Sequence, residues 1–163
     1  MKRASNAADE LDIRRVVERH RDMVFRIAFT YLRDPADADD VAQDVFVKFI
    51  RKTPAFANDE HVRRWLIRVT VNEYKSLFRR PWRRTDDIEQ YANTLSMPSR
   101  EHTDVFVSVM KLPERYRIPL MLRYYLGFST SEIADLIGVP GPTVRTRLAR
   151  GRARLKALLE KEE

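Results

Sequence analysis

Residues 128–159 read FSTSEIADLIGVPGPTVRTRLARGRARLKALL, and this stretch carries the strongest structural signal in the chain. Ser129 followed by Glu132 forms a capping box, which starts a short helix. Gly138 ends that helix, because the turn needs a residue that adopts a positive φ without strain. The β-branched Val144 then falls where a second helix crosses the first. The stretch therefore predicts a helix-turn-helix.

The second helix of the pair begins near Gly141 and has one apolar stripe. Consecutive residues lie about 100° apart around a helix axis. On that spacing its large apolar residues share one side with Gly151. The apolar members of this stripe are Val144, Leu148, Leu155, Leu158 and Leu159. Between Thr143 and Lys156 the helix also carries five arginines, one lysine and no acid.

This basic run has two interpretations, a solvated surface or a nucleic-acid contact. A solvated basic face is usually balanced by acids one helical turn away, and none is present here. Arginine also outnumbers lysine, and its forked donors suit guanine edges and phosphates. We therefore predict a recognition helix that binds DNA. The residues expected to contact DNA are Arg145, Thr146, Arg147, Ala149, Arg150, Arg152 and Arg154.

The overall composition is compatible with a basic, largely helical protein. The chain has 163 residues, a formal net charge of +7, 34% charged residues and four glycines. So few glycines, without alternating β-branched runs bounded by tight turns, disfavour an all-β fold. The positive charge favours a polyanionic partner, although membrane surfaces and acidic proteins would be attracted as well.

Several kinds of site are disfavoured by the residues present. The chain has no cysteine, which excludes disulfides and thiolate-bound metal, and its three histidines lack the spacing of metal ligands. Neither a phosphate-binding glycine loop nor a nucleophile elbow occurs, so we expect no catalytic residue, no cofactor and no small-molecule substrate. No stretch approaches the roughly 20 apolar residues that span a bilayer, and no signal peptide is visible. We expect a cytoplasmic protein that is not embedded in a membrane.

The first half of the chain has three helical patterns. Apolar residues recur at steps of three and four over residues 13–31, which indicates one long helix. Asp34 is a good N-cap and Pro35 a good first residue, so a second helix should run from Pro35 to Arg51. A third helix is expected to begin at residue 60 or 61 and to end at residue 80.

The pattern changes in the middle of the chain. Residues 81–100 contain two prolines and mixed charge without a sustained period, which indicates a linker. Helical periodicity returns after it, and Pro119 should bend that helix or shorten it. We therefore predict an all-α fold with two small helical domains over residues 9–80 and 104–160. A flexible linker over residues 81–103 would join them.

Three segments together resemble a known family. They are DADDVAQDVFVKF, starting at Asp37, WLIRVTVNEYKSLFRR, starting at Trp65, and LPERYRIPLMLRYYLGFSTSEIADLIGVPGPTVRTRLARGRARL, starting at Leu112. Their content and order are similar to those of sigma factors of the extracytoplasmic-function group, which carry only the second and fourth conserved sigma regions. The resemblance implies a factor that binds core RNA polymerase, recognises the −10 and −35 promoter elements and assists DNA melting.

An acidic face on the second helix points to a protein partner. Residues 34–44 contain five acids and no base, and such a face repels phosphate. The resemblance implies that this surface docks on the coiled coil of the polymerase β′ subunit, while the second domain meets the β flap. The matching docking positions are Asp40, Gln43, Asp44, Phe46 and Ile50. A merely solubilising acidic helix is the alternative.

The third helix has the opposite polarity, with one acid among many bases over residues 61–84. Phe56 precedes it outside any helical stripe and could stack on an unpaired base. The resemblance implies that a flipped base of the −10 element enters a pocket at Phe56 and Asn72. Asn72 as an ordinary helix-surface residue is the alternative. The full set expected at the −10 element is Phe56, Asn58, Arg63, Arg64, Arg68, Asn72 and Lys75.

The resemblance also assigns the outward face of the recognition helix to the −35 element. One departure is Pro140, which stands where the family usually has a small polar N-cap and which could shift the helix start. The partners implied are core RNA polymerase and promoter DNA. An anti-sigma protein is common in the family, but no residue here requires one.

Two other functions account for part of the sequence. A conventional helix-turn-helix regulator with an N-terminal sensor or dimerisation domain would bind duplex DNA without polymerase, and it leaves the acidic run and Phe56 unexplained. A small nucleic-acid-processing enzyme would need a clustered carboxylate or histidine metal site. The acids of residues 37–44 point several ways around one helix instead.

Overall fold

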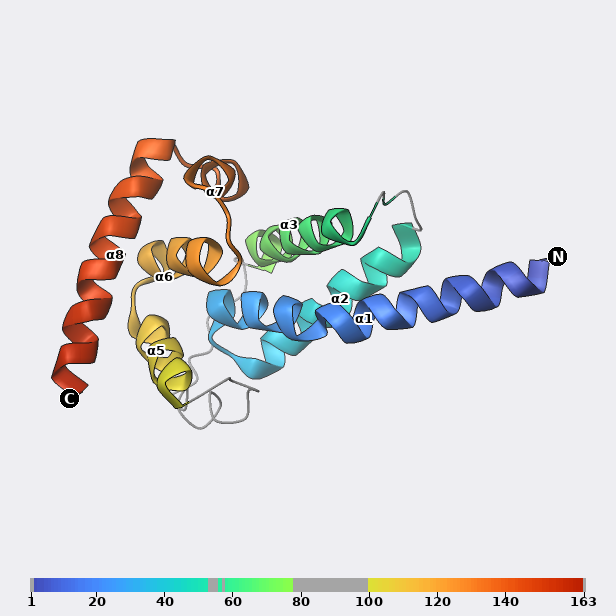
Figure 1. Cartoon of the computed structure of the whole chain (residues 1–163), viewed down its shortest axis with the longest axis horizontal. Helices are drawn as coiled ribbons and strands as arrows, with labels where there is room; N and C mark the ends of the chain where they lie inside the picture. Colours follow the sequence, from blue (N-terminus) through green and yellow to red (C-terminus); the bar gives the residue numbers. More distant parts are fainter. Residues whose placement is uncertain (1, 53–55, 57, 78–99, 163) are drawn as a thin grey trace. The chain divides into compact units, whose positions relative to one another are not determined.

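The structure is a computed structural model, and it describes residues 2–52, 56, 58–77 and 100–162 (Figure 1). Every regular element in this part of the chain is helical, which confirms the all-α prediction. Contacts divide the chain into two compact units. The first comprises residues 1–32 and 36–81, and the second comprises residues 33–35 and 82–163. Most of the predicted linker lies outside the described residues.

The first unit is built from three helices, with α1 (Lys2–Leu32) packed against α3 (Asp59–Leu77). The apolar residues from Val24 to the end of α1 are mostly buried, as the apolar periodicity predicted, and Tyr31 packs on Tyr74 of α3 with ring centroids 4.3 Å apart. Arg33 adopts a φ of 57°, so α1 ends there. The predicted break before Pro35 is confirmed.

The helix that follows, α2 (Pro35–Lys52), begins at the predicted proline. Its apolar stripe is fully or nearly fully buried, and consists of Ala38, Val41, Ala42, Val45, Phe46 and Phe49. Lys48 of α2 forms an ion pair with Glu73 of α3, which adds a polar tie between the two helices. The acids between these apolar positions are left on the solvent side.

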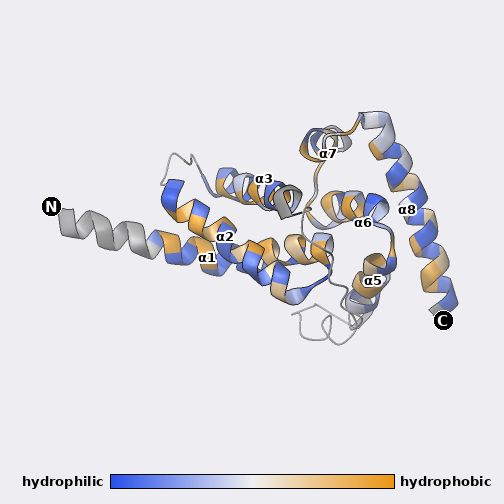
Figure 2. Ribbon diagram, turned by 180° about the vertical axis from the view of Figure 1, so that it is seen from behind, coloured by the Kyte–Doolittle hydropathy of each residue, from blue (hydrophilic) through white to orange (hydrophobic). Residues whose placement is uncertain are grey.

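The second unit is organised around its last helix, α8 (Gly141–Glu162). Against it pack α5 (Arg100–Lys111), α6 (Glu114–Leu120) and α7 (Thr130–Ile137) (Figure 1). The apolar residues of α8 turn toward these helices and the hydrophilic ones turn away, so both kinds alternate along the helix (Figure 2).

Gly151 lies where α6 and α8 approach each other closely. A Cβ at this position would lie 3.1 Å from Cδ1 of Leu120 and 3.3 Å from Cβ of Tyr116. Residues larger than glycine are excluded unless α6 shifts, because real Cβ contacts are rarely so short. The glycine in the apolar stripe thus sets how tightly α6 crosses α8.

Pro119 lies inside α6, which is seven residues long and begins at Glu114. Directly after Leu120 the chain passes into a π-helical segment, η1 (Met121–Tyr125), so the regular α-helix is short and ends beside the proline, in line with the predicted disturbance. The residues around the proline are buried, and the guanidinium of Arg117 donates a hydrogen bond of 2.8 Å to the carbonyl of Leu112 at the end of α5. Tertiary packing therefore holds a helix that proline alone would disfavour.

The helix-turn-helix is formed as predicted. Ser129 accepts a hydrogen bond from the backbone N–H of Glu132, and the Glu132 carboxylate accepts one from the backbone N–H of Ser129. Gly138 ends α7 with a φ of 72°. Val144 is fully buried where α8 crosses α7.

Candidate protein and nucleic-acid interfaces

The outward face of α8 carries the residues predicted to read base edges. Arg145, Thr146, Ala149 and Arg150 are all exposed, whereas Val144 is buried. The Thr146 hydroxyl donates a 3.0 Å hydrogen bond to the carbonyl of Pro142, which fixes its orientation. Helix α8 begins at Gly141, so the two prolines near its start do not displace it from the predicted position.

The other arginines of α8 differ from this group. Arg147 is half-buried, on the side that faces the N-terminal turn of α6. Arg152 donates a hydrogen bond of 2.8 Å to the hydroxyl of Tyr124, and the Arg154 guanidinium lies 5.0 Å from the ring centroid of Tyr116. Such a cation–π contact is favourable and limits the freedom of the side chain. The basic run is therefore two groups, and helical spacing also places Arg152 and Arg154 nearer the flanks of the helix than Arg145 and Arg150.

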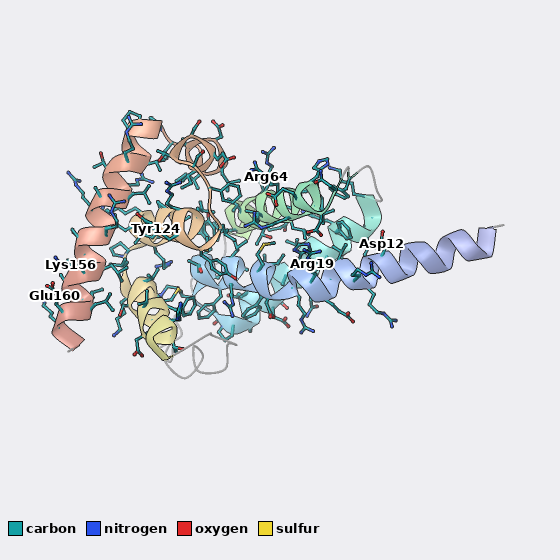
Figure 3. The ribbon with its side chains drawn as sticks, viewed as in Figure 1. Asp12, Arg19, Arg64, Tyr124, Lys156 and Glu160 are labelled. Atoms are coloured by element: carbon teal, nitrogen blue, oxygen red, sulfur yellow. The ribbon has the colours of Figure 1, made fainter. Side chains whose placement is uncertain are left out.

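Further along α8 the surface becomes an ordinary solvated helix. Lys156 and Glu160 lie one turn apart on the exposed side, with their charged atoms 3.8 Å apart (Figure 3). Exposed pairs of this kind contribute little to stability. Among the described residues, neither Arg145 nor Arg150 has a carboxylate within the 4.0 Å that defines an ion pair. The positive charge is thus uncompensated at the N-terminal half of the helix.

The predicted docking surface on α2 is acidic and accessible over most of its length. Asp40, Gln43 and Asp44 are exposed, and 46% of the surface of Ile50 is accessible to solvent. Val47 on the same helix is also exposed, with 43% of its surface accessible to solvent. Phe46 is a correction to the predicted set, because only 9% of its surface is exposed. It lies on the buried side of α2, where an apolar ring gains most from contact with the core.

The basic side chains predicted on α3 lie on that helix, and two of its arginines pair with an acid one turn earlier. Arg63 and Arg64 both bond the carboxylate of Glu60, at 3.5 and 3.1 Å. Arg64 projects from the outer side of α3 (Figure 3). Arg68 and Asn72 are exposed. The side chain of Lys75 lies outside the described part of the chain, although its backbone belongs to α3.

Asn58 has a structural role that the sequence did not suggest. Its side-chain oxygen accepts a hydrogen bond of 2.9 Å from the backbone N–H of His61, and its carbonyl accepts one of 3.2 Å from that of Val62. This is the geometry of a helix N-cap. The order N-x-x-H before an apolar residue was the signal that could have revealed it.

Phe56 belongs to an aromatic cluster. Its ring stacks on Phe49 with centroids 5.6 Å apart and meets Trp65 edge-on at 5.7 Å and His61 at 5.2 Å. Trp65 is half-buried, and the ammonium of Lys52 lies 5.2 Å from its ring. Phe56 is itself half-buried, so part of the ring remains accessible. The loop aromatic is held by α2 and α3, which the sequence could not predict.

A second contact fixes the start of α3. The Asp59 carboxylate meets the ring of His20 at 3.3 Å and the guanidinium of Arg19 at 3.3 Å, both on α1. His20 is buried, which agrees with the structural role expected for the histidines. The contact ties α1 to the N-terminal turn of α3, immediately after Asn58. Its partners are far apart in sequence and carry no local motif.

Neither metal chemistry nor a membrane span is indicated in the described part of the chain. No group of three or more His, Cys, Asp or Glu side chains is arranged to hold a metal ion there. No helix in the same residues combines the length and apolar character that crossing a bilayer requires.

Comparison with known proteins gives two family matches. The family model for Sigma-70 region 2 matches residues 16–84, and that for Sigma-70, region 4 matches residues 108–155. The chain is 31% identical over 156 residues to the ECF RNA polymerase sigma factor SigM of Mycobacterium tuberculosis, covering 94% of this chain and 80% of that protein.

Two solved structures are similar as well. CnrH, in complex with the cytosolic domain of CnrY, superposes with a TM-score of 0.61 at 25% identity, covering 98% of this chain and 96% of that one. The sigma factor RpoE of Bartonella quintana, in complex with the anti-sigma factor NepR, has a TM-score of 0.65 at 21% identity. The match covers 93% of this chain and 99% of that one. At that identity the second likeness concerns the fold.

Proposed function

This chain belongs to the extracytoplasmic-function group of sigma-70 factors, and we propose how its two units divide the work of starting transcription. As a sigma factor it directs core RNA polymerase to promoters. The assignment of individual tasks to individual residues is our proposal. The observation that supports this assignment is that the same chain has an exposed acidic face on α2 and an exposed arginine face without acids on the N-terminal half of α8.

We assign the −35 element to the outward face of α8. Arg145, Thr146, Ala149 and Arg150 project into solvent from the helix that follows the tight turn of the helix-turn-helix. A helix of this diameter fits the major groove, where forked arginine donors pair with guanine. Arg152 and Arg154 sit beyond this face, held by tyrosines, and we assign them to phosphates.

We assign polymerase docking to α2. Asp40, Gln43 and Asp44 form its polar part, and Val47 and Ile50 add exposed apolar surface. A mixed acidic and apolar face of this kind suits a basic, partly apolar helical partner, such as the β′ coiled coil. Phe46 supports the face from beneath, because its ring is nearly covered. The β flap is the proposed partner of the second unit.

We assign the −10 element to the loop before α3 and to the exposed side of that helix. Phe56 offers part of an aromatic face, and Asn72 offers an amide that can pair with a base edge. We assign the exposed cations Arg64 and Arg68 to the backbone of the melted strand, where a DNA phosphate would compete with Glu60 for Arg64. Melting is then driven by binding energy, since trapped bases offset the cost of unpairing.

The remaining assignments concern the kind of protein and its regulation. We propose that the chain is not itself an enzyme and that it acts in the cytoplasm, where core polymerase and the chromosome are found. RpoE is bound to an anti-sigma factor and CnrH to the cytosolic domain of CnrY in their solved structures. We propose that a protein of this kind restrains the present chain by covering its polymerase-docking or DNA-binding faces.

Run-off transcription tests the proposed function directly. Core RNA polymerase is incubated with a randomised promoter library, with and without the full chain, and the transcribed sequences are compared. The expected result is a set of promoters with paired −10 and −35 motifs that is transcribed only when the chain is present. Sequence-specific binding of the chain to duplex DNA without polymerase, and no effect on transcription, would support a conventional regulator instead.

A further inference from the structure

A basic cavity of about 380 Å³ lies between α6 and the N-terminal half of α8, within the second unit. Three arginines line it, Arg115 from α6 and Arg147 and Arg150 from α8. The side chains of Tyr116 on α6 and Thr143 on α8 also line it, together with Thr146, whose hydroxyl donates its hydrogen bond to the carbonyl of Pro142. Pro142 completes the lining, so no carboxylate from the described residues lines the cavity.

The electrostatics of the cavity point to an anionic ligand. Within the described residues, none of these three arginines has a carboxylate within ion-pair distance. Burial raises the pKa of the Tyr116 hydroxyl, but the charges of Arg115, Arg154 and Arg150 and a hydrogen bond from Arg115 outweigh it. The pKa of Tyr116 is therefore below its ordinary value of 10.0. A tyrosine in apolar surroundings would show the opposite shift.

The set of donors favours a phosphate group over a halide. A tetrahedral anion with several acceptor oxygens can use two arginine forks and a hydroxyl at once, whereas a small halide cannot. Arg115 and Arg150 are exposed, so the cavity is an open groove on the surface. Pockets that enclose small molecules are mostly apolar. An open basic groove is better suited to one phosphate of a continuous nucleic-acid strand.

The position of the cavity identifies the source of that phosphate. It shares Thr146 and Arg150 with the outward face of α8. A duplex whose major groove receives this face carries its sugar–phosphate strands along both flanks of the helix. One strand would then pass over the flank that holds Arg147, opposite Arg115 of α6.

We propose that Arg115, Tyr116 and Arg147 form a phosphate-binding groove that grips the DNA strand flanking the −35 element, with Arg150 at its border with the base-reading face. This inference rests on the proposed function of α8. It adds α6 to the DNA-binding surface and assigns it a contact that carries no sequence information.

Arg115→Ala tests the groove in the polymerase holoenzyme assembled with the full chain. Binding to promoter duplex is measured across a salt series and a set of −35 variants. The salt slope should fall by about 0.9, which corresponds to one phosphate contact. Affinity should fall alike for all variants, on the order of three- to ten-fold at low salt, with the preference among them unchanged. Arg115→Lys should retain most of the slope, because a point charge remains.

Lys161→Ala is the matched control, since it removes the same charge from the exposed last turn of α8, far from the cavity. It should leave the slope unchanged. A methylphosphonate scan of the duplex locates the contact: neutralising one flanking phosphate should weaken the parent protein and have no further effect on Arg115→Ala. Thermal unfolding of each variant shows that the fold is retained.

Two results would overturn the groove. Arg115→Ala could match Lys161→Ala, or it could change the preference among −35 variants, which would make it a base-reading residue. In each case the parent holoenzyme still selects promoters. If the parent itself shows no promoter preference, the proposed function fails first.

Discussion

The guanidinium of Arg152 donates a 2.8 Å hydrogen bond to the hydroxyl of Tyr124, which joins α8 to the π-helical turn that ends α6. Two residues later along the same helix, Arg154 lies over the ring of Tyr116. These contacts hold two cations against the unit. Arg145 and Arg150, which precede them, project into solvent without a carboxylate partner in the described residues. Two different contributions to DNA binding follow from this division.

Arg150→Ala and Arg154→Ala should have different effects on −35 recognition. Arg150 reaches base edges in our assignment, so its loss should flatten the preference among −35 variants, each bidentate contact being worth about 1–3 kcal/mol of discrimination. Arg154 is held by Tyr116 and is assigned to phosphate, so its loss should weaken all sequences alike and lower the salt slope by about one unit. Holoenzyme affinity across −35 variants and salt concentrations measures both. Equal, sequence-independent losses would mean that α8 holds only the DNA backbone.

Reversal of Asp40 and Asp44 to lysine should abolish binding to core polymerase, because a basic face would meet a basic partner. Both residues are exposed, so helicity by circular dichroism should be retained. Glu18→Lys with Asp22→Lys on α1 is the control, since this pair is exposed, has the same spacing and changes the charge equally. Co-purification with polymerase is the measurement. If the α2 variant still co-purifies, the docking face is elsewhere.

Two asparagines near the proposed −10 surface should respond differently to alanine. Asn58→Ala removes the N-cap of α3 and should lower the free energy of unfolding by about 0.5–2 kcal/mol. Asn72→Ala, at an exposed position, should change it by no more than about 0.5 kcal/mol. Promoter opening, followed with a fluorescent base analogue in the −10 element, should nevertheless be impaired by Asn72→Ala. Normal opening by this variant would leave Asn72 an ordinary surface residue.

Gly151→Ala should destabilise the second unit. The added methyl would lie 3.1 Å from Cδ1 of Leu120. Overpacking of this kind lowers the free energy of unfolding by about 1–3 kcal/mol. The better helix propensity of alanine offsets about 1 kcal/mol of that loss. Gly141→Ala is the control on the same helix, because its Cβ would meet nothing closer than 3.8 Å. Thermal unfolding compares them. Equal stability would show that α6 can move away without cost.

Tyr116 should ionise at a lower pH than an ordinary tyrosine, since its pKa is below 10.0. A group with a lowered pKa in the folded state stabilises the fold most above the unfolded pKa, and loses that contribution as the pH falls through the folded value. The stabilisation therefore grows as the pH rises from the folded pKa to 10.0, and it is fully present above that pH. Arg154→Ala removes one of the nearby charges and should raise the pKa. Carbon NMR of labelled tyrosine during titration measures it, and an unchanged value would contradict the proximity of the two groups.

The all-α fold and its main elements could be predicted because their signals are local. The capping box of Ser129 and Glu132, the positive φ of Gly138 and the start of α2 at Pro35 depend on residues within one or two turns of each other. Helical periodicity likewise separates exposed Asp40 from buried Val41 without knowledge of the partner surface. The acidic and basic faces on which the candidate sites depend are therefore visible in the sequence itself.

Only the tertiary structure shows which residues of those faces remain accessible to a partner. Phe46 is covered, Asn58 caps a helix, and Phe56 is held in an aromatic cluster. The groove at Arg115 is lined by residues of α6 and α8, which pack closely at Gly151. Such contacts join residues that are far apart along the chain, and their geometry depends on how side chains interlock at a helix crossing. Periodicity specifies which side of a helix turns inward, but the depth and angle of the crossing are set by packing against the partner helix.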